Sequence, residues 1–380
     1  MSRLIERILI LSEDYPPYPG GIAQWARGMA RGLAGASGAD VRVLYRPRKE
    51  FKVPPVDSGL TLIPIQGKRW KQFRTWICRK AVRETISSGF RPDLIIATTW
   101  NVARGLTGLK EKHGFRLVLV VHGLEITRPM PALKRWWLSE TLEKVDQIIS
   151  VSRFTAGRLI AGYPDVESKV RVLPNGVDPA DFQTSGLIPS LRQRFNPDGH
   201  PLLLTFARVI ERKGHDTVIR ALPAIIRETG PVIYLIAGKW EESWYQQLTQ
   251  LVKDLQLESV VRFTGYVTDE EKVAIYQMAD LYVMMSRELD GDTEGFGITY
   301  LEANVCGKPV IGGRSGGVAD AIVDGETGFL VDPTDSDRLA DRCIGLIKDP
   351  GLRSRLGENG RSRVRTTLTW QALATRFLSE

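Results

Sequence analysis

The sequence contains few cysteines and histidines, and its apolar runs are short. Its three cysteines, Cys78, Cys306 and Cys343, are odd in number and share no metal-ligand spacing, which favours a reduced, cytoplasmic setting over a disulfide framework. The four histidines are scattered and form no zinc motif. The longest apolar run near the start, Ile8 to Leu11, is far too short for a signal peptide or a membrane-spanning helix, so we expect neither.

Positive charge is plentiful but unevenly distributed. The formal net charge is +8, yet residues 1–180 hold 29 Lys and Arg against 16 Asp and Glu, whereas the remaining residues hold 23 against 28. A basic half joined to a mildly acidic half indicates either a domain that meets an anionic surface or substrate, or a solvated basic face without a partner.

Short runs of Val, Ile and Leu alternate with helix-length segments along the chain. In the first half the predicted strands are RILILSE, DVRVLYR, DLIIATT, RLVLVVHG, DQIISVS and KVRVLPNG, and the predicted helices span residues 22–34, 70–87 and 133–144. In the second half the predicted strands are LLLTFARV, VIYLIAG, VVRFTGYV, LYVMMS and KPVIGG. This alternation is typical of parallel sheets covered by helices on both faces.

We therefore predict an α/β protein with two doubly wound, Rossmann-like domains. The first domain spans residues 1–180 and the second spans residues 181–366, and residues 179–200, where Pro, Gly and Asn interrupt the pattern, form the linker. Residues 367–380 have the pattern of an amphipathic helix. Ligands of such sheets bind beyond the carboxyl ends of the strands, and the candidate site residues are sought there.

Two candidates follow strands of the first half. Gly20 and Gly21 precede a helix and could present backbone N–H groups to an anion, although a plain tight turn also explains them. The loop lacks the Gly-x-Gly-x-x-Gly pattern of dinucleotide-binding folds. His122 stands at the end of the strand RLVLVV, where a histidine can be catalytic or structural.

Two cations follow the first strand of the second half. Arg208 and Lys213 are five residues apart at a strand-to-helix turn, and Gly214 relaxes the backbone after them. The planar fork of arginine and the mobile charge of lysine could together clamp a diphosphate, with Arg212 as a third candidate cation. Surface charges are also common on such turns.

The stretch SRELDGDTEGFGITYLEANVCGKPVIGG carries two acidic patterns. Asp290-Gly-Asp292 resembles a metal-binding Asp-x-Asp motif, while Glu294 and Glu302 are eight residues apart near a helix that Gly295 and Gly297 precede. If one helix ran through both glutamates, their backbones would be about 12 Å apart. Because glycosidase carboxylate pairs are roughly 5–9.5 Å apart, this spacing disfavours a hydrolytic pair and favours two contacts to one extended ligand.

These motifs together resemble a known family. EGFGITYLE, PYPGGI, VVHG, VLPNGVD, RVIERKGHD, AGKW, FTGYV and GGVADAIVDGETGFLVDP are similar, in order and over almost the whole chain, to the retaining glycosyltransferases of family 4, the group 1 glycosyl transferases. The resemblance implies the GT-B fold, in which two Rossmann-like domains face each other across a cleft. It implies that the first domain binds the acceptor, that the second binds a nucleotide sugar, and that the helix at about residues 367–380 packs back on the first domain.

The resemblance also implies roles for the residues around the reaction centre. Arg208 and Lys213 would bind the donor diphosphate, Gly20 and Gly21 would close over the phosphate, and His122 would face the sugar. The leaving diphosphate would accept the proton of the acceptor on the same face, so that configuration is retained and no protein nucleophile is needed. Catalysis would then consist of positioning and charge stabilisation.

The remaining donor contacts are implied in the same way. Glu294 would hold hydroxyls of the donor sugar and Glu302 the hydroxyls of the ribose. The backbone N–H groups that contact sugar and phosphate oxygens would be those around Phe296, Gly297 and Ile298. The nucleobase would contact the turns that contain Gly238, Lys239, Tyr266 and Val267. The chain departs from the family's frequent Gly-x-Gly at Gly238-Lys239-Trp240, which leaves base recognition open.

Enzymes of this fold neutralise the leaving diphosphate with cations and a helix dipole, so we expect no metal and no cofactor, with Asp290 and Asp292 as polar loop residues. The favoured donor is GDP-mannose; a UDP-hexose or a UDP-N-acetylhexosamine is the alternative. The acceptor is expected to be a glycan or a lipid-linked molecule of the cell envelope.

The basic, tryptophan-containing stretches at residues 68–84 and 131–140 are typical of membrane-surface helices and predict peripheral contact with an anionic membrane, although their aromatic residues could equally pack inside. No nucleic-acid-binding motif accompanies them, so we expect no nucleic acid as a partner. A basic nucleic-acid-binding protein and a nucleotide-sugar epimerase are the competing hypotheses.

Overall fold

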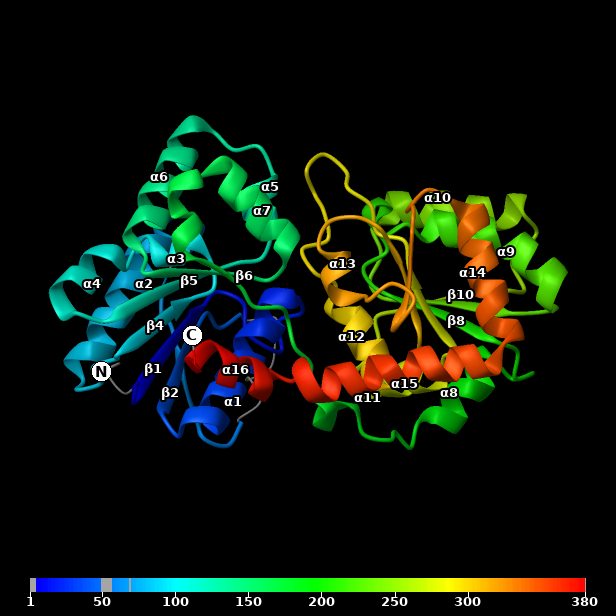
Figure 1. Ribbon diagram of the computed structural model, residues 1–380, viewed down its shortest axis with the longest axis horizontal. Coiled ribbons are helices and arrows are strands. Elements are labelled where there is room, and N and C mark those ends of the chain that lie inside the picture. The colour runs from blue at the N-terminus through cyan, green and yellow to red at the C-terminus, as the bar shows by residue number, and fades with distance from the viewer. Residues whose placement is uncertain (1–4, 49–56, 68–69, 380) are drawn as a thin grey trace. The chain divides into compact units, whose positions relative to one another are not determined.

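The computed structural model describes residues 5–48, 57–67 and 70–379. The chain forms two compact units, Met1–Gly176 with Leu368–Glu380 (unit 1) and Val177–Thr367 (unit 2), each built on a parallel sheet flanked by helices (Figure 1). The corresponding boundaries expected from the sequence lie after residues 180 and 366.

Unit 1 contains a seven-stranded parallel sheet in the order β3-β2-β1-β4-β5-β6-β7. Its strands are β1 (Arg7–Ser12), β2 (Asp40–Tyr45), β3 (Leu60–Pro64), β4 (Leu94–Ala97), β5 (Arg116–Val121), β6 (Gln147–Ser150) and β7 (Val170–Val172). Its helices are α1 (Gly21–Ser37), α2 (Trp70–Ser87), α3 (Trp100–Ala103), α4 (Thr107–His113), α5 (Leu124–Thr127), α6 (Ala132–Lys144), α7 (Arg153–Gly162), the 3-10 helix η1 (Pro164–Lys169) and α16 (Trp370–Ser379).

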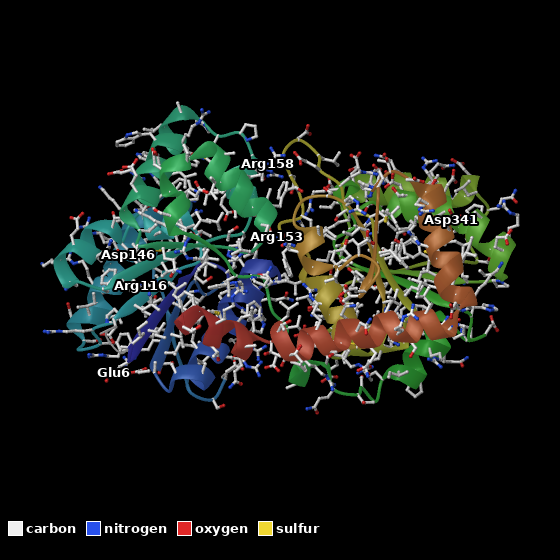
Figure 2. All side chains as sticks on the ribbon, in the orientation of Figure 1. Glu6, Arg116, Asp146, Arg153, Arg158 and Asp341 are labelled. Atoms are coloured by element: carbon white, nitrogen blue, oxygen red, sulfur yellow. The ribbon has the colours of Figure 1, made fainter. Side chains whose placement is uncertain are left out.

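The central strands of unit 1 are continuous apolar runs because both faces of the sheet are covered. All four residues of β4 are buried, and so are the last five of β5. Asp146, labelled in Figure 2, strengthens the pairing of β5 with β6. Its carboxylate accepts the Leu117 N–H at 2.7 Å and pairs with Lys110 at 2.6 Å. All six strands predicted in this half are present. The strand β3 was not predicted, because it lies at the sheet edge and is only partly buried.

The C-terminal helix α16 packs on α1 (Figure 1). Trp370, Leu373, Ala374 and Phe377 are buried, and Trp370 and Ala374 lie against α1. Small residues on α1 make room for them: a Cβ at Gly28 would lie 2.1 Å from the indole ring of Trp370, and one at Gly32 would lie 2.3 Å from the Trp370 carbonyl oxygen. Burying side chains of this size contributes about 1.5–3 kcal/mol each, which fixes the helix on unit 1.

Unit 2 contains a six-stranded parallel sheet in the order β10-β9-β8-β11-β12-β13. Its strands are β8 (Leu202–Phe206), β9 (Ile233–Ala237), β10 (Val261–Gly265), β11 (Leu281–Met284), β12 (Val310–Gly313) and β13 (Gly328–Val331). Its helices are η2 (Pro179–Phe182), α8 (Ile188–Phe195), η3 (Glu211–Lys213), α9 (His215–Thr229), α10 (Glu242–Asp254), α11 (Asp269–Met278), α12 (Ile298–Val305), α13 (Val318–Ala321), α14 (Ser336–Lys348) and α15 (Pro350–Thr367).

The segment expected to form the linker, residues 179–200, is partly helical and belongs to unit 2. Helix α8 occupies its middle and packs against α11. Leu191 and Phe195 are four residues apart, lie on one face of α8 and are buried. The flanking Pro, Gly and Asn residues hid this short amphipathic pattern.

Candidate functional site

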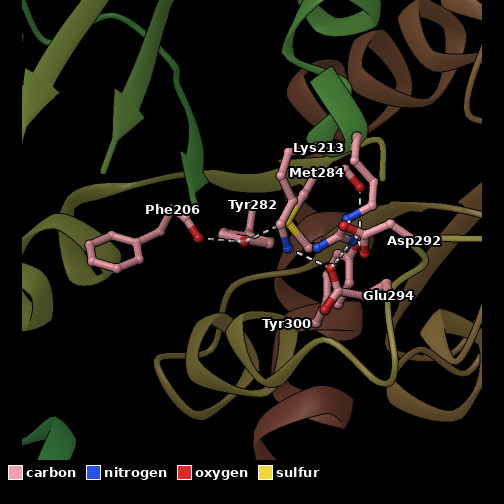
Figure 3. Close-up of polar contacts among 8 residues, drawn as sticks. Phe206, Lys213, Tyr282, Met284, Asp292, Glu294 and Tyr300 are labelled. Atoms are coloured by element: carbon pink, nitrogen blue, oxygen red, sulfur yellow. Dashed lines mark hydrogen bonds and ion pairs between the residues drawn. The ribbon is translucent and has the colours of Figure 1, made fainter. Parts of the chain in front are cut away.

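Three loops meet at the carboxyl ends of β8, β11 and β12, which are neighbours in the sheet of unit 2. The backbone N–H of Arg287, after β11, donates to the Arg212 carbonyl at 2.9 Å, and the N–H of Gly317, after β12, donates to the Glu294 carbonyl at 2.7 Å. Beneath them, the Tyr300 hydroxyl donates to the Met284 carbonyl at 2.6 Å (Figure 3). The loops therefore form one connected surface at the sheet edge where doubly wound folds bind ligands.

A cluster of two cations and two carboxylates lies at the centre of this surface. Lys213 Nζ is 2.5 Å from Glu294 Oε2, and Arg212 Nη1 is 3.1 Å from the same oxygen (Figure 3). Arg212 Nε is 3.1 Å from Asp292 Oδ1. Burial raises the pKa of Glu294, but the charges of Lys213 and Arg212 and their hydrogen bonds outweigh it and lower that pKa to about 2. Glu294 is therefore ionised at any physiological pH.

Gly214 sets the position of Lys213 in this cluster. Its φ is +68°, and a Cβ at this position would lie 2.0 Å from the Met285 carbonyl oxygen. Only glycine tolerates both the left-handed backbone and the close approach, so the chain can turn from η3 into α9 directly above β11. Lys213 ends η3 and thereby reaches Glu294.

Arg208, the other predicted cation, lies on the same loop in different surroundings. It is exposed and forms no ion pair with the residues that the structure describes. Burial lowers the pKa of Lys213, and Arg208 is among the positive charges that lower it further. The structure thus brings Arg208, Lys213 and Glu294 together. It also gives Arg212, which the sequence marked only as a third candidate, the central place in the cluster.

The Asp290-Gly-Asp292 pattern forms a tight turn. Leu289 and Asp292 exchange both backbone hydrogen bonds, at 2.9 and 2.7 Å, and the two residues between them, Asp290 and Gly291, have φ values of +50° and +73°. A two-residue hairpin turn with both central φ values positive favours the pair Asp-Gly. The pattern thus has a conformational explanation, and Asp292 pairs with Arg212. In the described part of the chain, no group of three or more His, Cys, Asp and Glu side chains could hold a metal ion.

Glu302 has its own polar partners in unit 2, apart from the Glu294 cluster. Helix α12 begins at Ile298, so it does not run through Glu294, and the distance of about 12 Å that assumed one continuous helix does not apply. The Glu302 side chain is 4% exposed, pairs with Lys272 and accepts a hydrogen bond from the Tyr276 hydroxyl at 2.7 Å. The contribution of Lys272 and Tyr276 was not predicted from the sequence.

The other donor-site candidates also lie in unit 2. Phe296 is buried, Gly297 is the N-cap of α12, and Ile298 is the first residue of that helix, whose first N–H groups have no partner within the helix. These three residues follow Glu294 in the chain after Gly295.

The two turns expected to contact a nucleobase are joined by a hydrogen bond from the Gly238 N–H to the Gly265 carbonyl at 3.0 Å. Lys239 Nζ lies 5.3 Å from the centre of the Tyr266 ring, which is 70% exposed, and Val267 follows it. Trp240 stacks on Tyr245, with ring centres 4.5 Å apart. Trp240 stands where the family frequently has the second glycine of Gly-x-Gly, and its stacking on Tyr245 places an aromatic pair beside the predicted turns.

The candidates of unit 1 lie at the ends of β1 and β5. Gly20 caps α1 and Gly21 begins it. His122 follows β5 and contacts Trp25 of α1 edge-on, with ring centres 6.0 Å apart. Burial lowers the pKa of His122 to about 4 despite a hydrogen bond to the Thr98 backbone, so its ring is neutral at pH 7. Its Nε2 atom has no hydrogen-bond partner among the described residues.

The two basic aromatic stretches divide between core and surface. Trp70 is buried and donates its indole N–H to Glu13, whereas Trp76 on α2 is 62% exposed. On α6, Trp137 packs under the guanidinium of Arg104 at 3.9 Å, whereas Trp136 is 60% exposed. Both alternatives left open by the sequence therefore occur, one tryptophan of each stretch packing inside and one facing out. Within the described ranges, no helix combines the length and the hydropathy that a bilayer crossing requires.

Family models match both units. Residues 19–181 match the model described as Glycosyltransferase Family 4, and residues 189–363 match the model described as Glycosyl transferases group 1. Similar solved structures include the Anabaena protein HepE in complex with UDP (21% identity, TM-score 0.78, 98% of each chain) and sucrose-phosphate synthase from Thermosynechococcus elongatus (22% identity, TM-score 0.79, 98% of each chain). The chain belongs to the group 1 glycosyl transferases and has the GT-B fold, which confirms the predicted family and fold.

Curated relatives extend over nearly the whole chain. One is the GDP-mannose-dependent alpha-(1-6)-phosphatidylinositol monomannoside mannosyltransferase of Mycolicibacterium smegmatis, which is 28% identical over 97% of each chain. Another is the GDP-mannose-dependent monoacylated alpha-(1-6)-phosphatidylinositol monomannoside mannosyltransferase of Corynebacterium glutamicum, 27% identical over 98% of this chain and 96% of the relative. The glycogen synthase of Mycobacterium tuberculosis is 25% identical over 97% and 92%.

Proposed function

We propose that this glycosyltransferase moves a hexose, with retention of configuration, from a nucleoside-diphosphate sugar to a lipid-linked or glycan acceptor of the cell envelope. GDP-mannose is the favoured donor, because relatives similar over nearly the whole chain are named as GDP-mannose-dependent mannosyltransferases. The observation that carries the proposal is the cluster of Lys213, Arg212 and Glu294 beside the exposed Arg208 at the carboxyl end of β8.

In this proposal the cluster exchanges partners when the donor binds. Lys213 and Arg208 contact phosphate oxygens, and the Glu294 carboxylate accepts hydrogen bonds from hydroxyls of the donor sugar. The cations and the first N–H groups of α12 stabilise the charge that develops on the leaving diphosphate. A phosphate oxygen of the leaving group takes the proton of the acceptor hydroxyl, so neither a protein nucleophile nor a metal is required. His122, neutral at pH 7, offers its Nε2 atom as a hydrogen-bond acceptor to a sugar hydroxyl.

We also propose peripheral contact of unit 1 with an anionic membrane that carries the acceptor. The support is chemical complementarity: Trp76 and Trp136 are exposed, and exposed cations accompany them, including Arg79 and Lys80 on α2 and Arg135 on α6. Exposed tryptophans beside Lys and Arg suit the interface between water and anionic lipid. A groove of about 430 Å³ adjoins Trp136.

The test begins with a panel of GDP-, UDP- and ADP-sugars examined by thermal shift. The expected result is stabilisation by GDP-mannose above the other sugars, followed by addition of one hexose to phosphatidylinositol monomannoside, detected by mass spectrometry. A larger shift with a UDP-sugar would select the alternative donor. Binding of nucleic acid without any nucleotide-sugar binding would overturn the proposal, and so would conversion of the donor into an epimer when no acceptor is present.

A further inference from the structure

Helix α11 presents two polar side chains to Glu302. Its start is fixed by a capping box, in which Thr268 Oγ1 accepts the Glu271 N–H at 3.2 Å and Glu271 accepts the Thr268 N–H at 2.9 Å. Lys272 follows directly, and Tyr276 is four residues further on, so both side chains lie on the same face of the helix. Because the capping box fixes where α11 begins, it also fixes where Lys272 and Tyr276 lie relative to α12.

Each oxygen of the Glu302 carboxylate is held by one of these residues. Lys272 Nζ contacts Oε1, and the Tyr276 hydroxyl donates to Oε2 at 2.7 Å. A carboxylate whose two oxygens are bound by two different side chains has a defined plane and orientation. An ionised carboxylate has about four lone-pair sites, so one held in this way can still accept hydrogen bonds from a ligand.

Aromatic rings surround the Lys272–Glu302 pair. The ring centres of Phe182 and Phe206 lie 5.3 and 5.9 Å from Lys272 Nζ, and the ring of Tyr276 packs against that of Phe206 at 5.3 Å. The side chains of Lys272 and Glu302 are 17% and 4% exposed. Because little water reaches this site, solvent would not replace the lysine as the partner of Oε1, and the carboxylate would lose its fixed orientation.

We propose that Lys272 and Tyr276 are positioning residues that hold the Glu302 carboxylate in the orientation in which it accepts the ribose hydroxyls of the donor nucleotide. The inference rests on the proposed function, which assigns Glu302 to the ribose. Neither residue touches the nucleotide in this proposal; both act through the carboxylate. Their removal should therefore change how strongly the site distinguishes a ribonucleotide from its deoxy analogue, which a role confined to packing α11 on α12 would not do.

The experiment measures dissociation constants of the full-length protein for GDP, UDP and ADP, and for the 2′-deoxy and 3′-deoxy forms of whichever binds most tightly. Because a hydrogen bond to a charged group contributes to binding, the wild-type protein should prefer the ribonucleotide by roughly 10- to 100-fold over at least one deoxy form. Lys272→Met and Glu302→Gln should each abolish most of this preference, and Lys272→Arg should retain much of it. Lys253→Met, which removes an exposed lysine from α10, is the control and should leave the preference unchanged.

Steady-state kinetics adds a second readout, because a contact to the ribose changes little between ground state and transition state. Lys272→Met should raise KM for the donor with a small effect on kcat. Should Lys272→Met fail to fold, Tyr276→Phe, which deletes one hydroxyl, should reduce the same preference to a smaller extent. If the variants lose affinity equally for the ribonucleotide and its deoxy form, or if folded variants keep the preference, the inference is overturned but the proposed function is not. A wild-type protein that binds no nucleoside diphosphate overturns the proposed function together with it.

Discussion

Arg208 and Lys213 have the same proposed role but different surroundings, and this difference makes their alanine variants a sharp test. Loss of one group that stabilises a leaving group lowers turnover by about 10²–10³-fold, or about 2.7–4 kcal/mol. Arg208→Ala and Lys213→Ala should both show a loss of this size. Their effects on stability should differ, because Lys213 is paired with Glu294 at 2.5 Å whereas Arg208 is exposed.

The size of the stability effect follows from the cluster. Removing one partner of a buried ion pair destabilises a protein by about 3–5 kcal/mol, because the other charge remains buried. In Lys213→Ala, Arg212 still contacts Glu294 at 3.1 Å. We therefore expect this variant to lower the free energy of unfolding by about 3 kcal/mol or less, at the lower end of that range. Arg208→Ala should change the free energy of unfolding by no more than about 0.5 kcal/mol. The double variant Lys213→Ala/Glu294→Gln should recover stability, since the excess negative charge left by removing Lys213 is gone, but it should not recover turnover.

The assay combines initial rates of acceptor-dependent nucleotide release with urea unfolding of the same preparations. Near-normal turnover in both folded single variants would refute the diphosphate assignment. Equal destabilisation by Arg208→Ala and Lys213→Ala would refute the account of Lys213 as an ion-paired residue of the free protein. Failure of the double variant to recover stability would show that the lost energy comes from packing rather than from charge.

Three further predictions concern other residues of the two units. Glu294→Gln should lower kcat more than it raises KM, because the sugar changes charge and shape during transfer, whereas Glu302→Gln should chiefly raise KM; identical kinetic profiles would contradict this division. Activity should persist in EDTA, and Asp290→Asn should leave activity and stability near wild type, because asparagine also suits a positive φ; strict dependence on added Mg²⁺ or Mn²⁺ would revive the metal-motif hypothesis. Replacing Trp76 and Trp136 together by Ser should weaken binding to anionic vesicles at low salt, measured by co-sedimentation; wild-type protein that binds anionic and neutral vesicles equally would rule out the membrane surface.

The central strands could be predicted because strands that are buried on both faces are continuous apolar runs in the sequence. Every strand predicted as an apolar run is present, including β5 (RLVLVV) and the fully buried β9 (IYLIA). Edge strands have a weaker apolar pattern, and the half-exposed β3 and the short β13 were not predicted. The sequence indicated Asp290 and Asp292 as polar loop residues, and the Asp-Gly pair at 290–291 is the one that a type I′ hairpin turn favours.

The pairings inside the site could not be predicted, because they join residues far apart in the chain. Arg212 and Glu294 are 82 residues apart, and Lys272 and Glu302 are 30 apart. The sequence places each residue at the end of a strand or on a helix, but it does not say which cation faces which carboxylate. That choice depends on the order of strands in the sheet and on the packing of α11 beside α12.

These pairings bear on how the donor site can accept a dianionic group. In the free protein Arg212 and Lys213 carry two positive charges, and Asp292 and Glu294 carry two negative charges within 3.1 Å of them, so the buried cluster is balanced by itself. A balanced cluster does not attract a diphosphate from a distance, and its carboxylates would repel one at contact. The exposed Arg208 adds a positive charge beside this cluster that no carboxylate of the described residues pairs with. In the proposed function, Arg208 therefore acts first, drawing in the diphosphate, and Lys213 is released to it only when the sugar hydroxyls replace the lysine at Glu294. Sugar recognition and leaving-group stabilisation are then one event, because neither can occur while the Lys213–Glu294 pair persists.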